Sequence, residues 1–595
     1  MKNTIINFTL LAGLLLGLSI CLAFTAEEND WQEKVSPVVL GQAMAGESVE
    51  IIVYFSSQAD LSATKALATK GEKALYAHRE LSKTAKQAQA NVQQILKMAN
   101  AKYRSFYVIN AIHTEVDASL LQQLAAQTEV ARIYPNTLIE KAAVVQETSP
   151  NLRGGTPEWG ITMIGADQVW EMGYRGQGVV IGGQDTGYEW EHSVLKEQYR
   201  GWQNGQADHN YNWHDAIREI NNLHNDNDPN DPANNPCGLD VGAPCDDQNH
   251  GTHTMGTMVG EDDENQIGVA PGARWVACRN MERGYGSPAT YIECFEWFMA
   301  PTDLNNERPN PLLAPHVINN SWGCPTMEGC EPENYSLMEK VVENLKFSGV
   351  VVVVSAGNNG TDGCNSIRNP AAIFEQSFTI GATAKNDTIA RFSSRGVVTA
   401  DGSNRLKPNV SAPGVSVRSA IRNGAFANFS GTSMAGPHVA GLVALVISAN
   451  PALAGHVSLI EEIIESTAVP KTDEMDCGSV LGSSHPNAVY GFGRVNALAA
   501  VEKALQVEIP KLEYTHRLYP VPFREIVNLE LKNWSGRTTL RVFNALGQQV
   551  ATDTWGIPGQ GVNTFELNFS RLATGLYFYE LENGTNTQSG KFLKN

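Results

Sequence analysis

The nonapeptide at residues 179–187 reads VVIGGQDTG, a β-branched run that ends on a carboxylate and turn residues. Similar short apolar runs follow it along the chain, and helical patterns lie between several of them. These runs are at 275–277, 317–319, 350–354 and 378–380. Continuous apolar strands that alternate with helices predict a parallel sheet covered on both faces. We therefore expect an α/β fold with a doubly wound, mostly parallel sheet.

Polar residues stand where three of these runs end. Asp185 follows the first run, and Ser321 and Asn358 follow the third and fourth. In open α/β sheets, active sites lie beyond the carboxyl ends of the strands. We expect these three residues to meet at one edge of the sheet.

Ser433 lies in SGTSMAGPHVAG, residues 430–441, a stretch dense in small residues. Small residues allow a tight turn, and Pro437 suits the first turn of a helix. At a helix N-terminus, free N–H groups and the helix dipole favour negative charge on a substrate oxygen. The simpler interpretation is a helix cap, the commoner role of serine.

A serine hydroxyl is a weak nucleophile unless a base removes its proton and a third group orients that base. His250, in NHGTHTMGT at residues 249–257, is the candidate base. His253 lies three residues later on the same helical face, which could also indicate a metal pair, but the sequence offers no third ligand. We interpret His250 as the base and His253 as a packing residue.

Asp185 is the candidate orienting group, because a carboxylate buried behind an apolar strand needs a partner such as an imidazole. Its alternative is an ordinary turn residue. Asn358, in SAGNNG at residues 355–360, could donate its side-chain amide to a developing oxyanion. Asn-Gly pairs are also common in left-handed turns, so a structural role stays open for Asn358.

Together these passages resemble the subtilisin-like serine proteases (peptidase family S8) over roughly 158–500, and most of all their bacillopeptidase F group. The order Asp, His, Ser matches that family and differs from the α/β-hydrolases. The resemblance implies that Ser433 is the nucleophile, His250 the general base and Asp185 its orienting partner, with Asn358 in the oxyanion hole. It also implies a substrate cleft lined by Ser321, Trp322, Gly323, Ser355, Ala356 and Gly357.

The first 26 residues are typical of a secretion signal. Lys2 precedes an apolar run from Leu10 to Phe24, and small residues offer cleavage points. A retained membrane anchor is the first alternative, although the run is short for a bilayer span. A lipidated Cys21 is the second, although Ile20 before it fits that poorly.

Residues 27–150 are predicted to form an α+β domain and linker. Strands at 49–55 and 130–134, an extended stretch at 105–116, and helices at 74–101 and 118–126 give the order βαββαβ. The domain resembles the ferredoxin-like inhibitory propeptide of the same protease family (inhibitor type I9). This resemblance implies an autoprocessed zymogen in which the propeptide is a binding partner. We expect cleavage within 136–157.

Residues 151–508 would then be the catalytic domain, and 512–595 a separate β-sandwich, because apolar residues alternate there between turn residues. The last segment resembles the C-terminal sorting domain of the type IX secretion system. The matching stretches are Tyr519-Pro520, 542–548, 572–577 and 590–594, although Val521 departs from the usual motif. This implies export across both membranes to the cell surface or medium. An accessory domain that binds substrate or sugar is the alternative.

The formal net charge of −19 makes nucleic acid an unsuitable partner. Eight cysteines follow Cys21, and an even number in an exported chain indicates disulfides. We favour Cys237–Cys245 and Cys324–Cys330, and leave the other pairings open. The chemistry requires no cofactor. Structural Ca²⁺ is an open alternative in the acidic loop at Asp226, Asp228 and Asp231, where a solvated loop is about as consistent with the sequence.

The sequence therefore predicts a secreted serine endopeptidase that acts on proteins and peptides. Two other hypotheses stay open at this stage. One is a non-catalytic binding protein that has kept the fold, and the other is a dedicated processing protease with few substrates.

Overall fold

The computed structural model describes residues 30–136, 139–140, 145–147, 155–220, 236–321, 335–509, 515–534, 536–557, 562–583 and 586–595. The described chain divides into two compact units. One contains residues up to 58 together with 83–137, and the other contains 59–82 and everything after 137. The predicted signal sequence and most of the predicted linker lie outside the described residues.

A seven-stranded sheet forms the centre of the larger unit, and all its strand pairs are parallel. In spatial order the strands are β10 (Trp213–Asp215), β11 (Arg274–Arg279), β7 (Val180–Asp185), β13 (Val317–Asn320), β14 (Val351–Ser355), β15 (Phe378–Thr383) and β16 (Val410–Pro413). The predicted doubly wound α/β fold is confirmed. Five of the seven strands coincide with the predicted apolar runs, whereas β10 and β16 were not predicted.

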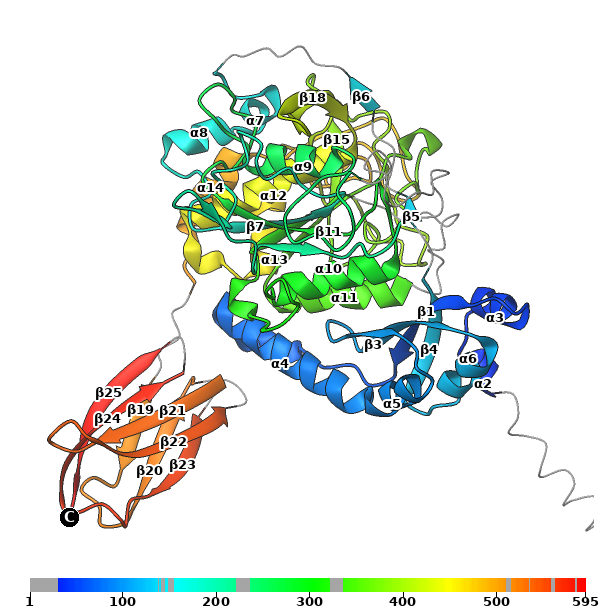
Figure 1. Cartoon of the computed structure of the whole chain (residues 1–595). Helices are drawn as coiled ribbons and strands as arrows, with labels where there is room; N and C mark the ends of the chain where they lie inside the picture. Colours follow the sequence, from blue (N-terminus) through cyan, green and yellow to red (C-terminus); the bar gives the residue numbers. More distant parts are fainter. Residues whose placement is uncertain are drawn as a thin grey trace, which may run out of the picture. The chain divides into compact units, whose positions relative to one another are not determined.

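Helices cover both faces of this sheet (Figure 1). The helices α9 (His250–Val259) and α12 (Thr432–Ala449) lie on one face, and α10 (Pro288–Met299) and α11 (Tyr335–Phe347) lie on the other. The remaining helices of the catalytic region are α7 (Trp159–Ile164), α8 (Ala166–Glu171), α13 (Val457–Thr467) and α14 (Ala497–Gln506).

Among the described residues, α12 is the one helix long and apolar enough to cross a membrane. However, 89% of it is buried inside the protein. Its side chains contribute to the main hydrophobic core, between the sheet and α14. The composition of α12 is therefore explained by its place at the centre of the fold.

Three disulfides join described cysteines: Cys237–Cys245, Cys278–Cys294 and Cys364–Cys477. The first confirms one of the two predicted pairs. The other predicted pair, Cys324–Cys330, lies outside the described residues. Cys364–Cys477 spans 113 residues of sequence, so it closes by far the longest of the three loops.

The smaller unit contains a four-stranded antiparallel sheet in the order β2-β3-β1-β4. Its strands are β1 (Val49–Phe55), β2 (Tyr103–Phe106), β3 (Ala111–Val116) and β4 (Val130–Pro135), and its helices are α2 (Asp30–Glu33), α3 (Pro37–Met44), α5 (Ala90–Met98) and α6 (Ala118–Ala125). The predicted order βαββαβ is present. The single helix predicted at 74–101 is instead two helices, α4 (Lys70–Ala88) and α5, and α2 and α3 were not predicted.

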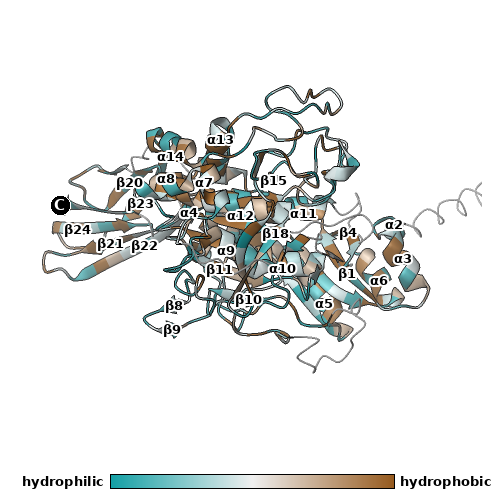
Figure 2. Cartoon of the chain, turned by 90° about the horizontal axis from the view of Figure 1, so that it is seen from above, coloured by the Kyte–Doolittle hydropathy of each residue, from teal (hydrophilic) through white to brown (hydrophobic). Residues whose placement is uncertain are grey.

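The C-terminal segment folds as two antiparallel sheets, β19-β20-β23 and β22-β21-β24-β25. Their strands are β19 (Thr515–Tyr519), β20 (Ile526–Lys532), β21 (Gly536–Phe543), β22 (Gln549–Ile557), β23 (Val562–Asn568), β24 (Gly575–Glu582) and β25 (Thr587–Lys594). Hydrophobic and hydrophilic residues alternate along these strands (Figure 2), and the inward residues form a separate core around Trp534 and Phe592. The predicted β-sandwich is therefore present.

Candidate active site

Asp185 and His250 form a buried pair at the carboxyl end of the central sheet. Asp185 is the last residue of β7, and His250 is the first residue of α9. The imidazole Nδ1 lies 2.8 Å from both carboxylate oxygens, and both side chains are almost fully excluded from solvent. A carboxylate in this position fixes the orientation of the ring and selects the tautomer with the proton on Nδ1.

Hydrogen bonds to a second carboxylate, that of Asp246, hold the start of α9 against the end of β7, and Gly251 leaves room for this close packing. Asp246 accepts hydrogen bonds from the backbone N–H groups of Asn249 and Thr252 and from the hydroxyl of Thr186. A Cβ at Gly251 would lie only 2.0 Å from the carbonyl oxygen of Gly187. Glycine at this position therefore allows the helix to approach the strand end closely enough for His250 to reach Asp185.

Ser433 is in the first turn of α12, and this turn lies beside the start of α9. A Cβ at Gly441 would lie 3.3 Å from the carbonyl oxygen of Met258. These residues come eight positions after Ser433 and His250, respectively. Nearer the helix starts, His253 stacks on Phe429, which packs with Met434. The two helices therefore run in the same direction with their N-terminal turns side by side.

The serine hydroxyl and the imidazole are not yet hydrogen-bonded to each other. The hydroxyl of Ser433 donates to the carbonyl oxygen of Ser321 at 3.2 Å. Within the described part of the chain, Nε2 of His250 has no hydrogen-bond partner although it is buried. A rotation of the serine side chain would turn its hydroxyl away from Ser321, and catalytic hydrogen bonds often tighten only when substrate binds.

Asn358 is oriented by the residue that precedes the serine. Its Oδ1 accepts hydrogen bonds from both the backbone N–H and the hydroxyl of Thr432, each at 2.9 Å. Because the amide oxygen faces Thr432, the NH₂ group of Asn358 points away from it. That NH₂ and the N–H groups at the start of α12 are the donors that an oxyanion hole requires.

Residues 176–493 match the Subtilase family. The chain belongs to the subtilase family. Subtilases are serine-type endopeptidases, and the parallel-sheet fold described above is that of this family. Residues 517–595 match the secretion system C-terminal sorting domain. This subtilase therefore carries a type IX sorting domain after its catalytic region.

Curated relatives agree with this assignment. The subtilase is 35% identical to bacillopeptidase F from Bacillus subtilis (strain 168) over 71% of its own length, but it covers only 28% of that larger protein. It is 29% identical to subtilisin DY from Bacillus licheniformis over 58% of its length and covers 99% of that protein. A solved structure, the epidermin leader peptide processing serine protease from Staphylococcus aureus, matches with a TM-score of 0.53 at 15% identity. That structure covers 78% of the subtilase and is itself covered completely, which supports the fold.

Of the six predicted cleft residues, Ser321 and Ser355 have buried side chains that support the serine loop. Ser321 Oγ donates to the carbonyl oxygen of Ser433, and Ser355 Oγ donates to that of Thr432. Ala356 and Gly357 follow β14 directly, and Gly357 has a φ of +98°, in the region that favours glycine. Trp322 and Gly323 lie outside the described residues. A backbone role for these positions in substrate pairing stays a prediction.

His253 is enclosed rather than reactive. Its Nε2 lies 3.0 Å from the carbonyl oxygen of Val417, and its ring stacks on Phe429 at a centroid distance of 4.2 Å. Burial, followed by the nearby His250, lowers the pKa of His253 to about 3, so its ring is neutral at physiological pH. The structure thus gives His253 the packing role predicted from the sequence.

No cluster of metal ligands is present among the residues that the structure describes. Asp226, Asp228 and Asp231, where the sequence left structural Ca²⁺ and a solvated loop as open alternatives, lie outside that set, so both alternatives stay open.

Two short strands that precede the catalytic region pair with strands that adjoin segments of the candidate site. Strand β5 (Ile139–Glu140) pairs with β12 (Tyr285–Gly286), and β6 (Val145–Glu147) pairs with β18 (Ala425–Ser430). Strand β18 leads directly into the loop of Ser433. Strand β12 follows the turn after β11, in which the N–H of Asn280 donates to the carbonyl oxygen of Asp185. The sequence did not predict either pairing.

Replacement of Asn358 tests the oxyanion geometry. We expect Asn358→Ala to lower kcat by about 10²–10³, a magnitude measured in subtilisin itself and therefore borrowed from this family. KM should change little, because the amide acts mainly on charge that develops in the transition state. Steady-state kinetics on a chromogenic peptide would check this result. The matched control is Asn359→Ala, the next residue along the same loop, and equal losses in both variants would contradict the assignment.

Proposed function

We propose that this subtilase hydrolyses peptide bonds through an acyl-enzyme on Ser433, and that it is made as a zymogen that cleaves its own chain. One observation carries the catalytic part of the proposal. A buried imidazole is paired with Asp185 through Nδ1, and its Nε2 has no hydrogen-bond partner among the described residues, beside the helix turn that contains Ser433.

In the proposed reaction, Nε2 of His250 takes the proton of the Ser433 hydroxyl as the oxygen attacks the scissile carbonyl. The carbonyl π electrons move onto oxygen, and the Asn358 amide and the backbone N–H of Ser433 stabilise this oxyanion. The imidazolium then protonates the leaving amine as the C–N bond breaks, which leaves an ester on Ser433. A water molecule, activated by the same imidazole, hydrolyses the ester and restores the serine.

The proposal that the chain is a self-cleaving zymogen rests on strands β5 and β6. These strands pair with β12 and β18, the two strands that adjoin segments of the candidate site, and only residues 141–144 separate them. An extended peptide that adds to existing strands on both sides of a reactive residue is bound as a substrate would be. We therefore place the scissile bond among Lys141, Ala142, Ala143, Val144 and Val145, within the range of 136–157 predicted from the sequence.

Sequencing of the new N-terminus tests this proposal. We expect the wild-type full chain to convert itself into a form that begins between Ala142 and Val145, while the Ser433→Ala chain stays intact. A wild-type chain that remains uncut when purified, or the same cut in the Ser433→Ala chain, would contradict self-cleavage. Mixing wild type with the Ser433→Ala chain would show whether one molecule can cut another.

The sorting domain extends the proposal to location. We propose that the protein crosses the inner membrane by its N-terminal signal and the outer membrane through the type IX machinery. Its substrates would then be proteins and peptides outside the cell. The match of residues 517–595 to the sorting-domain family supports this route.

A further inference from the structure

Residues 59–82, here called the arm, belong to the same compact unit as the catalytic region although they precede the proposed cleavage site. The arm contains the 3-10 helix η1 (Ser62–Ala66) and the first turns of α4. Leu61, Thr64, Leu67 and Ala77 of the arm are buried. The arm is therefore a packed part of this unit rather than a loose connection.

The first turn of α4 is held rigid by a reciprocal cap. The hydroxyl of Thr69 accepts a hydrogen bond from the N–H of Glu72, and the carboxylate of Glu72 accepts one from the N–H of Thr69. This capping box fixes the direction of the helix start. It also places Lys70 and Lys73, three residues apart, on one side of the helix.

Both lysines donate to carbonyl oxygens of the catalytic region. Lys70 Nζ lies 2.7 Å from the oxygen of Ala314, and Lys73 Nζ lies 2.7 Å from the oxygen of Gly455. Burial, assisted by the charge of Arg200, lowers the pKa of Lys70 to about 7. The catalytic region also donates to the arm, because Nε2 of His456 lies 2.9 Å from the carbonyl oxygen of Ala68.

Two glycines give the receiving surface its shape. Gly349 and Gly455 have φ angles of +88° and +86°, in the region that favours glycine. A Cβ at Gly455 would also lie 2.8 Å from Cα and 3.0 Å from the backbone nitrogen of Lys70. Any side chain at Gly455 would therefore push the arm away, because its nearest neighbours are backbone atoms that cannot rotate aside.

This surface lies at the opposite edge of the sheet from the triad. Ala314 comes just before β13, and Gly349 comes just before β14. Ser321 and Asn358, which belong to the candidate active site, follow the carboxyl ends of the same two strands. An occupant of the surface would thus leave the triad accessible.

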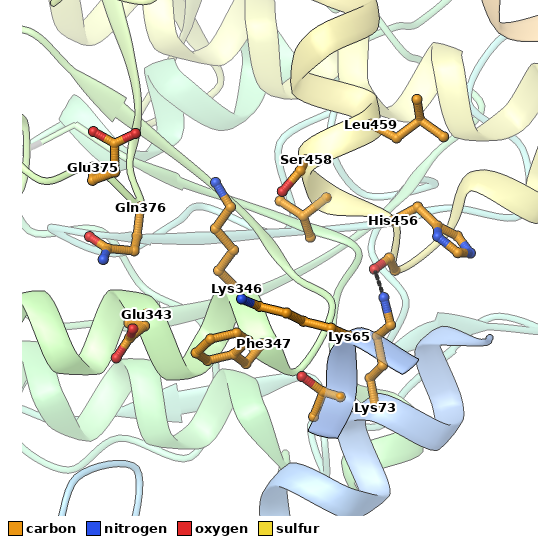
Figure 3. A pocket seen from close by; sticks show the side chains of 13 residues that line it. Lys65, Lys73, Glu343, Lys346, Phe347, Glu375, Gln376, His456, Ser458 and Leu459 are labelled. Atoms are coloured by element: carbon orange, nitrogen blue, oxygen red, sulfur yellow. Dashed lines mark hydrogen bonds between the residues drawn. The ribbon is translucent and has the colours of Figure 1, made fainter. Parts of the chain in front are cut away.

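Between the arm and the surface lies a pocket of about 470 Å³ whose lining is polar and apolar in equal measure. Figure 3 shows Lys73 of α4 with its hydrogen bond to Gly455, and Lys65 and Lys346 at the same opening. Glu343 and Glu375 also line the pocket, and Lys65 Nζ lies 5.7 Å from the centroid of the Phe347 ring. A pocket with these charged groups at its opening admits water to part of the interface.

We propose that Ala314, Gly349, Gly455 and His456 form an exosite, a binding surface outside the triad cleft, and that the arm is its ligand. The exosite recognises a capped helix start with lysines at its first and fourth positions. It retains the N-terminal fragment after the chain is cut. The proposal rests on the proposed function, because the arm becomes a separate fragment only if cleavage occurs after it.

Hydrogen exchange on the full chain tests the docking without any need for cleavage. In a Ser433→Ala background, we expect Gly455→Ala to speed amide exchange at residues 62–82 at least tenfold. The matched control is Gly478→Ala, which has a similar positive φ of +64° but no atom within 4 Å of an added Cβ. That control should leave exchange in the arm unchanged. Equal protection of the arm in both variants would overturn the exosite.

If Gly455→Ala also speeds exchange in α12, the substitution has disturbed the whole unit. A second variant, Lys73→Met, then tests whether the arm is docked on the exosite. We expect Lys73→Met to speed amide exchange in the arm. The control Lys83→Met changes a solvent-exposed position on the same helix and should leave the arm protected. Equal exchange in both variants would overturn the proposal. In the active chain, the N-terminal fragment should co-elute with the catalytic fragment in wild type and separate in the Lys73→Met variant. Co-elution in both would overturn retention by the exosite. Failure of the proposed function would appear differently, as a wild-type chain that is never cut.

Discussion

Ser433→Ala should lower kcat for peptide hydrolysis by about 10⁶, a factor taken from subtilisin, the worked case for this family. The substitution removes the hydroxyl that His250 activates in the proposed mechanism. Binding of the peptide should persist, because the groups that support the cleft are unchanged. The measurement is steady-state kinetics on a peptide substrate, with labelling by a serine-directed fluorophosphonate as a second readout.

Ser448→Ala is the matched control for this variant. Ser448 is also buried and lies near the other end of the same helix, within the main core. We expect full labelling and activity within a few-fold of wild type in Ser448→Ala, and no labelling in Ser433→Ala. Retained peptidase activity in Ser433→Ala would end the triad assignment and would revive the hypothesis of a non-catalytic binding protein.

The site was predictable from the sequence because each of its parts is local. Asp185, Ser321 and Asn358 follow short apolar strands, and a parallel sheet brings the carboxyl ends of its strands to one edge. His250 and Ser433 begin helices that are rich in small residues, which identified the turns. The strands β10 and β16 lacked this signal, because WHD at 213–215 and VSAP at 410–413 contain no continuous apolar run.

The features that escaped prediction depend on partners far away in the sequence. The break between α4 and α5 occurs at Gln89, whose buried amide donates to the carbonyl oxygen of Phe106 and to Oδ1 of Asn110. The sequence pattern predicted one continuous helix because it does not reveal these hydrogen bonds to residues distant in the sequence. Cys364–Cys477 spans 113 residues, and spacing alone could not choose it from the other pairings.

Dependence on distant partners also explains why the role of the arm and the short strands β5 and β6 were not predicted. Lys70 and Lys73 look like ordinary solvated lysines on a polar helix, and only the carbonyl groups of Ala314 and Gly455 give them a role. Strands β5 and β6 are two and three residues long. Their existence depends on β12 and β18, so their own composition predicts no strand.

Asp185→Asn should lower kcat by about 10⁴, the loss measured for this change in another Ser-His-Asp protease. In the wild type, both carboxylate oxygens lie 2.8 Å from Nδ1 of His250, so that nitrogen carries the proton and Nε2 is free to accept one. An amide NH₂ facing Nδ1 would favour the opposite tautomer. His250 would then present a proton to Ser433 instead of a lone pair.

Asp247→Asn separates this tautomer effect from the general effect of placing an amide near the site. Asp247 is buried three residues before His250, and burial raises the pKa of its carboxyl group well above the usual range. An amide has nearly the same size as a carboxyl group, and among the described residues no hydrogen bond joins Asp247 to His250, so we expect kcat within a few-fold of wild type. A large loss in Asp247→Asn together with a small one in Asp185→Asn would show that Asp185 does not control the proton on His250. The expected contrast would instead show that catalysis depends on the carboxyl group of Asp185 in particular, because its two oxygens hold the imidazole in the tautomer that activates serine.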